Sequence, residues 1–383
     1  MSLTIAVTGM NATDNPGPGV AVIRAIRDAC PDCTIVGLAY ETLDPGNFMP
    51  GVADHAYLLP YPSMGAEALG ERLLAIHALT PIDVLIPTLD AELPIWVRLQ
   101  ELLASRGIKT FLPDAEALAL RNKDRLHELV ELGVSVPKSM VLTDPTKIPD
   151  IADELGYPVV VKGRFYDAYV AQTPHDVAHW FHKLANSWGL PVIIQKFVPG
   201  TEFDVVGVGD GEGGLIGSVA MRKMQLTDKG KAWGGVTVRD TYLESFVRDT
   251  VRALSWRGPC ELEVMRGDDG DLYLIEINPR FPAWVYLSAG AGRNLPWATV
   301  ELALGRDVEP MPPAPPGVMF LRHSLDQILP LSDFEALTVH GELHRAPIPE
   351  PPAEEPPAPA RPQPAAPNAD LAALATFPTE FPA

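Results

Sequence analysis

The segment Ile275-Glu-Ile-Asn-Pro-Arg280 decides the fold of this chain, together with the acidic segment Glu261-Leu-Glu263 that precedes it. The two segments lie in the apolar runs Leu272–Ile277 and Cys260–Met265, which a Gly267-Asp-Asp-Gly270 turn separates. Glycine and aspartate favour tight turns between strands. The pattern therefore predicts two neighbouring antiparallel strands.

Three polar side chains are predicted to meet on these strands. Because side chains alternate between the two faces of a strand, Glu261 and Glu263 share one face of the first strand, and Glu276 and Asn278 share one face of the second. Carboxylate and amide oxygens are ligands that Mg²⁺ accepts alongside substrate phosphates. We therefore predict a metal site at Glu263, Glu276 and Asn278. A solvated polar strand face, or a set of structural ion pairs, is the alternative.

Lysine and arginine residues gather at three further places. Lys123 lies in an Arg-Asn-Lys-Asp-Arg segment, and Lys162 ends the apolar strand predicted at Val159–Lys162. A lysine at a buried strand end usually needs an anion, and phosphate is one such anion. The segment from Arg222 to Lys231, which includes Lys223, holds four cations and one acid. Such a loop suits a lid over polyphosphate, although a solvated surface charge explains each lysine equally well.

The segment between Val192 and Glu202 suggests a nucleotide-binding hinge. It begins as an apolar strand, passes through Gln195, Lys196 and Val198, and ends in an acid after a Pro-Gly pair. Backbone groups at such a hinge can bind the edge of adenine, and the acid can accept hydrogen bonds from ribose hydroxyls. An ordinary strand followed by a Pro-Gly turn is the alternative.

Taken together, these patterns resemble the ATP-grasp superfamily, and within it the carboxylate–amine ligases of the carbamoyl-phosphate-synthase-like type. The resemblance covers about residues 1–308. It implies ATP and Mg²⁺ as cofactors, with Mn²⁺ as an alternative metal. It also implies a nucleotide held between the two lobes of an α+β domain, which an α/β domain precedes.

The resemblance assigns a role to each residue of these patterns. Those implied to bind the nucleotide are Lys123 and Lys162 (phosphates), Gln195, Lys196 and Val198 (adenine), and Glu202 (ribose). Those implied to bind the metal are Glu263, Glu276 and Asn278, and those implied to be catalytic are Arg280, Lys223 and Arg222.

The activity that the resemblance implies is an ATP-dependent ligation. ATP phosphorylates a carboxylate to an acyl phosphate, and an amine or similar nucleophile displaces the phosphate. A catalytically weak or inactive nucleotide-binding scaffold, or a regulatory protein, is the alternative. It is suggested by the loop Gly163–Tyr169, which holds one glycine where the family has a glycine-rich loop. Phe281 and Trp284 are also bulky where the family often has small residues, and they either shape the acceptor pocket or belong to the core.

The order of the predicted elements divides the chain into an α/β part and an α+β part. Strands and helices alternate in the N-terminal third, which predicts a parallel sheet. The spacing of Gly9, Gly17 and Gly19 does not match the G-x-G-x-x-G of a dinucleotide-binding dehydrogenase. The strands predicted there are Thr4–Thr8, Thr34–Leu38, Val84–Ile86 and Lys109–Leu112, followed by one long helix at Asp114–Leu132.

The predicted domains are a pre-ATP-grasp α/β domain (1–112), an ATP-grasp small lobe (113–190), a large lobe with the metal site (191–308), an extension packed on the body (309–345) and a disordered Pro/Ala-rich tail (346–383).

The composition limits the partners. The 383 residues carry a formal net charge of −19, and binding to duplex nucleic acid needs a basic face, so we predict no nucleic acid partner. No apolar run reaches the roughly 18 residues of a membrane span, and the N-terminus lacks the basic start of a signal peptide. We therefore predict a cytoplasmic protein that acts on small-molecule or peptide carboxylates and amines, with a homodimer left open. The end of the tail, Leu371–Ala383, is either a docking motif for a protein partner or part of a solubilising tail.

The pair Cys30 and Cys33 stands in a Cys-Pro-Asp-Cys motif. A redox pair or half of a zinc site is the functional interpretation. No second Cys or His pair stands at metal-binding spacing. We therefore favour a chance coincidence of two cysteines at the end of a helix.

Overall fold

The computed structural model describes residues 2–13, 15–164, 167–226 and 232–345. The chain divides into two compact units, Met1–Ala346 and Pro347–Ala383. The second unit lies outside the described residues, and so do the predicted tail and its Leu371–Ala383 segment. Lys229 and Lys231 of the predicted lid also lie outside the described residues.

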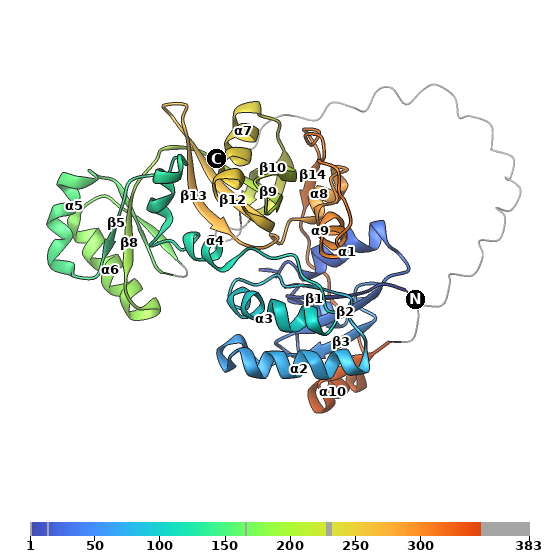
Figure 1. Ribbon diagram of the computed structural model, residues 1–383. Coiled ribbons are helices and arrows are strands. Elements are labelled where there is room, and N and C mark those ends of the chain that lie inside the picture. Colours follow the sequence, from blue (N-terminus) through green and yellow to red (C-terminus); the bar gives the residue numbers. More distant parts are fainter. Residues whose placement is uncertain (1, 14, 165–166, 227–231, 346–383) are drawn as a thin grey trace, which may run out of the picture. The chain divides into compact units, whose positions relative to one another are not determined.

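The N-terminal part is built on a five-stranded sheet with the strand order β15-β3-β2-β1-β4. Its parallel strands are β1 (Thr4–Thr8), β2 (Thr34–Ala39), β3 (His55–Leu58) and β4 (Val84–Ile86). Three long helices cover it, namely α1 (Gly19–Ala29), α2 (Ala66–Leu79) and α3 (Leu93–Ser105) (Figure 1). The α/β sheet predicted from the alternating pattern is therefore present.

One predicted strand of this sheet is wrong. Lys109 forms only an isolated bridge to Val84. The chain then turns away from the sheet, because Phe111 packs under the guanidinium of Arg257, 4.1 Å from the ring centroid. The carbonyl of Leu112 accepts a hydrogen bond from the same guanidinium. Contacts to a distant segment thus overcome the strand propensity of residues 109–112.

The long helix predicted at Asp114–Leu132 is also wrong. The structure has a short helix α4 (Ala115–Leu120), capped by the Asp114 side chain, and a 3₁₀ helix over Leu126–Leu132. The turn between them is closed by a hydrogen bond from the amide of Arg125 to the carbonyl of Asn122. Asparagine and aspartate compete with helical hydrogen bonds, which explains a break within the Arg-Asn-Lys-Asp-Arg segment.

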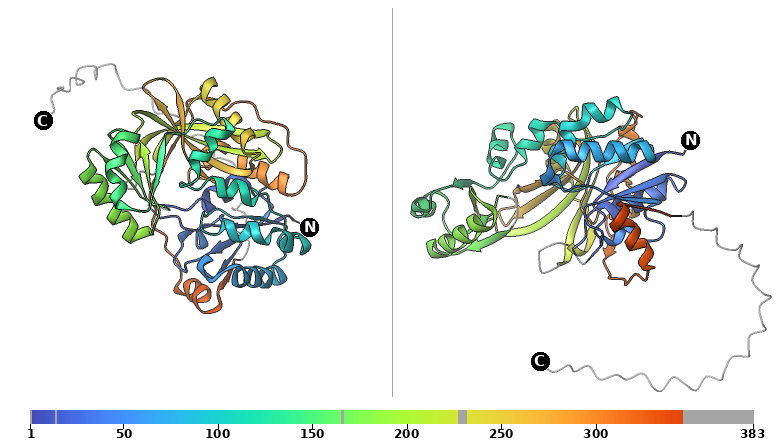
Figure 2. Two further views of the ribbon diagram at one scale, coloured as in Figure 1. Left: turned by 60° about the vertical axis from the view of Figure 1, so that its left-hand side comes forward. Right: turned by 90° about the horizontal axis from the view of Figure 1, so that it is seen from below.

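A four-stranded antiparallel sheet forms the small lobe, with the order β5-β8-β6-β7. Its elements are β5 (Ser139–Leu142), α5 (Ile148–Glu154), β6 (Val159–Lys162), β7 (Ala168–Ala171), α6 (Pro174–Trp188) and β8 (Val192–Lys196). The helices α5 and α6 lie on one side of the sheet (Figure 2). Thr173 and Asp176 form a capping box that fixes the start of α6.

The large lobe is a six-stranded antiparallel sheet with the order β13-β12-β9-β10-β11-β14. Its strands are β9 (Gly200–Asp210), β10 (Leu215–Leu226), β11 (Ala232–Thr237), β12 (Arg257–Gly267), β13 (Leu272–Asn278) and β14 (Met319–Leu321). Its helices are α7 (Thr241–Ala253), α8 (Tyr286–Gly290) and α9 (Leu295–Ala303). The two antiparallel strands predicted around the Gly267–Gly270 turn are therefore present as β12 and β13, and both extend further than predicted.

The two faces of the large-lobe sheet have different surroundings. Val205 and Leu262 pack with α7 in one buried cluster. Val206 and Val219 face the other way and pack with Trp284 and α9. Asp204, Lys223 and Glu263 alternate onto this second face, so the alternation of the strands places the candidate site there.

The last described elements return to the N-terminal sheet. After α10 (Leu331–His340), strand β15 (Glu342–His344) pairs antiparallel with β3. Leu337 and Leu343 are buried against Phe48 and Ala56. The described C-terminal residues thus complete an edge of the first sheet.

Cys30 and Cys33 form a disulfide immediately after α1. The helix ends at these residues, as predicted, but the interpretation of the pair as a chance coincidence is wrong. Cys260 is a free, buried cysteine.

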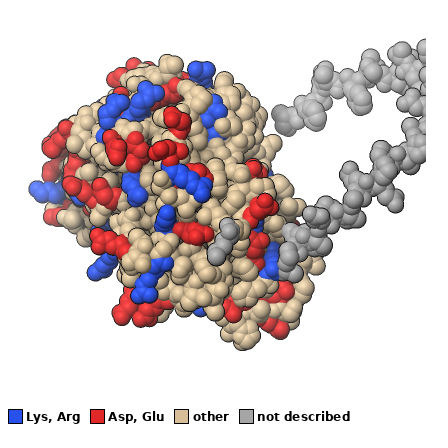
Figure 3. All heavy atoms as spheres, turned by 45° about the vertical axis from the view of Figure 1, so that its right-hand side comes forward, with Lys and Arg blue, Asp and Glu red and all other residues tan. Residues whose placement is uncertain are grey.

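The surface carries charges of both signs. On the face drawn in Figure 3, acidic side chains are spread over most of the surface, with basic side chains between them. No helix among the described residues has the length and apolar character needed to cross a membrane.

Candidate functional site

The predicted metal ligands lie side by side on β12 and β13. Glu263 is directly opposite Glu276, and Glu261 is directly opposite Asn278. The amide nitrogen of Asn278 donates hydrogen bonds to Glu261 (3.1 Å) and to Glu263 (3.2 Å). These bonds fix the amide, so the two strands bring Glu263, Glu276 and Asn278 together as the alternation predicted, and Glu261 joins them.

A third strand adds carboxylates to this cluster. Asp204 on β9 is opposite Glu263 and is almost fully buried. Its Oδ1 atom has no hydrogen-bond partner among the described residues. Burial, followed by the nearby charge of Glu261, raises the pKa of Asp204 well above its usual value. Burial and the charge of Glu276 likewise raise the pKa of Glu263 to about 7.

The crowding of acids fits a bound cation. No group of three His, Cys, Asp or Glu side chains among the described residues is arranged to hold a metal by itself. Mg²⁺ usually takes one or two carboxylates and completes its ligands with phosphates and waters. The oxygens of Glu263, Glu276 and Asn278 suit that mode of binding, and a divalent cation would relieve the repulsion that raises the carboxylate pKa values.

Two lysines from different parts of the chain lie beside β13. Lys123, in the turn between α4 and the 3₁₀ helix, lies 3.2 Å from Glu276. Lys162, at the end of β6, is buried, and its Nζ lies 3.4 Å from the carbonyl of Ile275. Burial lowers the pKa of Lys162 to about 8, although the charge of Glu276 opposes this. The predicted phosphate-binding lysines are therefore next to the predicted metal ligands.

Lys223 belongs to the same face of the sheet. Its ammonium lies 2.5 Å from Glu202 and 3.2 Å from Asp204. Burial alone would lower the pKa of Lys223, but the charges of Asp204, Glu263 and Glu202 raise it above its usual value. Lys223 and Glu202, which were predicted for different roles, thus form an ion pair.

Arg222 is not part of the site. It precedes Lys223 on β10, so it points to the opposite face, where its side chain is exposed. The strand pattern itself contained this information, because two adjacent residues of a strand cannot share a face.

Arg280 is held by two acids. Its Nε donates to Asp90 (3.0 Å) and its Nη1 donates to Glu261 (3.1 Å). The indole of Trp284 also donates to Glu261 (2.7 Å). Phe281 and Trp284 are buried, which places both in the core rather than in an open acceptor pocket.

The segment predicted to bind adenine lies at the end of β8. Gln195 is buried on β8, between Ser139 of β5 and Val160 of β6. The amide of Lys196 donates to the carbonyl of Lys138, so a backbone contact of Lys196 with adenine would have to use its carbonyl group. Val198 lies half-buried beyond the end of β8.

Sequence reasoning missed Asp90 and Asp204, and it did not connect Glu261 with Arg280. Asp90 follows β4 by a few residues, at the carboxyl end of a parallel strand. Ligands of open α/β sheets bind at this end of the sheet, and that rule could have identified Asp90. The position of Asp204 beside Glu263 follows only from the pairing of β9 with β12, which the sequence does not show.

Parts of this chain are similar in sequence to known proteins. The family model described as "ATP-grasp in the biosynthetic pathway with Ter operon" matches residues 190–323. The carbamoyl phosphate synthase large chain of Thermomicrobium roseum is 26% identical over 221 residues, which are 54% of this chain and 20% of that protein. The phosphoribosylamine–glycine ligase of Synechocystis is 25% identical over 214 residues, with 50% of this chain and 51% of that protein covered.

Solved structures share the fold. The biotin carboxylase of Campylobacter jejuni, in complex with an ATP analogue, matches 79% of this chain and 71% of that chain, with a TM-score of 0.63 and 18% identity. An ADP complex of N5-carboxyaminoimidazole ribonucleotide synthetase matches 81% and 79%, with a TM-score of 0.60 and 17% identity.

These sequence similarities support the assignment of the chain to the ATP-grasp superfamily. The chain spans about a fifth of the length of the carbamoyl phosphate synthase large chains that it matches, and about half of the glycine ligase. The reaction of this chain must therefore be inferred from the residues of its own site.

Proposed function

We propose that this protein is an ATP-dependent ligase that activates a carboxylate as an acyl phosphate and joins it to an amine or a similar nucleophile. The observation that carries the proposal is the meeting of two lysines from separate elements, Lys123 and Lys162, with the acids of β12 and β13. Cations that gather beside a crowded acidic cluster suit a polyphosphate bound together with a metal.

The nucleotide would exchange existing ion pairs for new ones. Lys123 would move from Glu276 to a phosphate oxygen, which would free the Glu276 carboxylate for the metal. Lys162 would contact phosphate from its buried position, and the charge of the phosphate would favour its protonated form. Gln195 and Glu202 are proposed to bind adenine and ribose.

Glu263, Glu276 and Asn278 would hold Mg²⁺ together with the phosphates. When bound, Mg²⁺ neutralises charge on the transferred phosphoryl group and aligns it with the attacking carboxylate. Mn²⁺ accepts the same oxygen ligands.

Arg280 and Lys223 would stabilise the acyl phosphate. A carboxylate oxygen attacks the γ-phosphorus, and the bond to ADP breaks. The amine nitrogen then attacks the acyl carbon, loses a proton, and expels phosphate. Preorganised cations that face the developing negative charge lower the barrier to such a step. Arg280 is already held in place by Asp90 and Glu261, so little reorganisation is needed.

The inactive-scaffold alternative gains no support from the comparisons, because the relatives named above are synthases and ligases. We propose small-molecule or peptide carboxylates and amines as substrates, and a cytoplasmic location. A homodimer is proposed by analogy with the biotin carboxylase domain of the Hydrogenobacter thermophilus 2-oxoglutarate carboxylase, which shares the fold and forms a dimer.

The test is release of ADP and phosphate from ATP with a panel of acids and amines, in the presence of Mg²⁺. Glu276→Gln keeps the size of the side chain but removes its charge, and we expect turnover to fall by about a hundredfold or more. Glu212→Gln, in an exposed turn of the same lobe, is the matched control. ADP formation that is the same in Glu276→Gln and in the wild type would refute the assignment.

A further inference from the structure

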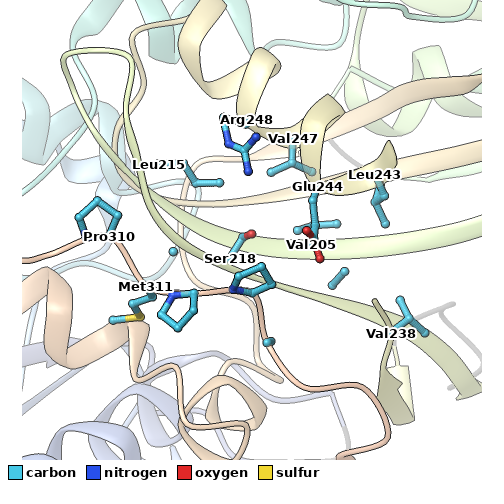
Figure 4. Close-up of a pocket in the computed structure, with 15 residues that line it drawn as sticks. Val205, Leu215, Ser218, Val238, Leu243, Glu244, Val247, Arg248, Pro310 and Met311 are labelled. Carbon is cyan, nitrogen blue, oxygen red and sulfur yellow. The ribbon is translucent and has the colours of Figure 1, made fainter. Parts of the chain in front are cut away.

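A cavity lies on the opposite face of the large-lobe sheet from the candidate site. It has a volume of about 160 Å³ and lies between β9, β10, α7 and the segment 310–314. Figure 4 shows its walls, with Leu215, Val247 and Met311 among the apolar side chains. Val205 lines this cavity, whereas its neighbour Asp204 faces the acidic cluster. The two sites are therefore separated by the thickness of one sheet.

Three polar side chains point into this mostly apolar space. Arg248 and Glu244 are one helical turn apart on α7, and Ser218 reaches in from β10 (Figure 4). Within the parts of the chain that the structure describes, none of these three side chains forms a hydrogen bond or an ion pair with another side chain. By contrast, Arg252, one turn further along α7, pairs with Asp249 at 2.7 Å. The charges at the cavity are thus available to a ligand.

The burial of the lining residues indicates how a ligand would be oriented. Arg248 is exposed at the rim, whereas Leu243 and Val247 are buried at the wall. A ligand with a charged head and a short apolar tail matches this change from a charged, exposed rim to a buried, apolar wall. An arginine side chain pairs readily with a carboxylate, and a glutamate pairs with an ammonium group. The volume slightly exceeds that of an engineered cavity of about 150 Å³ that binds benzene, so the apolar part must be small.

We propose that this cavity binds an α-amino acid with a small aliphatic side chain. The carboxylate of the ligand pairs with Arg248, its ammonium group pairs with Glu244, and its side chain fills the apolar space beside Val205 and Met311. Ser218 supplies a hydroxyl to the ligand head. The site is distinct from the nucleotide site, so binding requires neither ATP nor metal.

The ligand chemistry is tested by calorimetric titration of the nucleotide-free, full-length protein with L-leucine. We expect saturable binding at one site. Two analogues each remove one charge, namely 4-methylpentanoate, which lacks the ammonium group, and 3-methylbutylamine, which lacks the carboxylate. Each should bind at least about tenfold more weakly, because a charge-assisted contact is lost. Absence of saturable leucine binding, or equal binding of the three compounds, overturns the proposal.

The location is tested by substitution. Arg248→Gln should weaken leucine binding at least about tenfold, and the exposed position of Arg248 makes the variant safe for folding. Arg252→Gln, on the same helix but outside the cavity, should bind leucine like the wild type. Glu276→Gln, in the acidic cluster, should also keep binding. Leucine binding that is lost in Glu276→Gln and kept in Arg248→Gln would place the ligand at the nucleotide site and refute the cavity.

Discussion

Arg280 is the residue on which distant parts of the chain converge. Asp90, 190 residues earlier in the sequence, accepts from its Nε, and Glu261 accepts from its Nη1. The guanidinium groups of Arg280 and Arg121 hold the pKa of Asp90 below its usual value, against the opposing effect of burial. Asp90 is therefore a positioning residue, which acts by orienting Arg280.

The substitution Asp90→Asn should separate kcat from KM. It weakens one of the two contacts that hold Arg280, and a displacement of about 1 Å can reduce turnover by about a hundredfold. The KM for ATP should change little, because Asp90 is not among the residues proposed to bind the nucleotide. Steady-state ADP release measures both constants. Asp54→Asn, which breaks the ion pair with Arg27 in the same domain, should leave kcat unchanged. An equal loss of kcat in both variants would contradict the positioning role.

Contacts between site residues were predictable from the sequence where the two residues lie close together in the chain. Glu263, Glu276 and Asn278 lie on two strands joined by a tight turn, so alternation alone brings them together. Asp90 and Asp204 were missed because their partners come from other sheets or strands, and alternation within one strand does not show which distant segments meet.

At the scale of elements, the edge between β3 and β15 contains two facing histidines. The Nδ1 atoms of His55 and His344 lie 3.0 Å apart. Burial and the neighbouring His344 lower the pKa of His55, and the charge of Asp54 opposes this. Glu342 lies 3.8 Å from the other side of His344. A protonated His55 is thus disfavoured in the folded chain.

The edge should therefore weaken in acid. Because the pKa of His55 is lower in the folded than in the unfolded chain, the folded state loses stability as the pH falls below about 6.5, the ordinary value for histidine. The melting temperature of the wild type should fall between about pH 7.5 and about pH 5.5 by more than that of His344→Gln. His175→Gln, an exposed histidine of the small lobe, should behave like the wild type. Identical pH dependence in all three proteins would rule out this effect.

Elements with a continuous apolar run were predictable, whereas elements that depend on pairing with distant segments were not. The strand Val159–Lys162 lies where its apolar run predicted it. Strands β14 and β15 have three residues each, and they exist because they pair with edges far away in the sequence. The apparent strand at Lys109–Leu112 failed for the converse reason, since Arg257 draws this segment away.

At the scale of the whole molecule, the site requires all parts of the compact unit. Asp90 belongs to the first domain, Lys162 to the small lobe, and Glu276 and Arg280 to the large lobe. The sequence predicted the fold of each part from local patterns. It could not predict how the parts meet, because the ion pairs that join them are long-range.

The described C-terminal residues should be needed for stability, whereas those after Ala346 should not. Residues 1–346 form a compact unit without the rest, so a chain ending at Ala346 should keep the melting temperature and the ATP affinity of the full protein. A chain ending at Leu329 lacks α10 and β15, which removes the buried Leu337 and Leu343 and uncovers the edge of β3. Each buried leucine contributes about 1.5–3 kcal/mol, so its melting temperature should fall by more than about 5 °C. Calorimetry of both chains provides the measurement. Equal melting temperatures for the two truncated chains would show that β15 does not stabilise the first sheet.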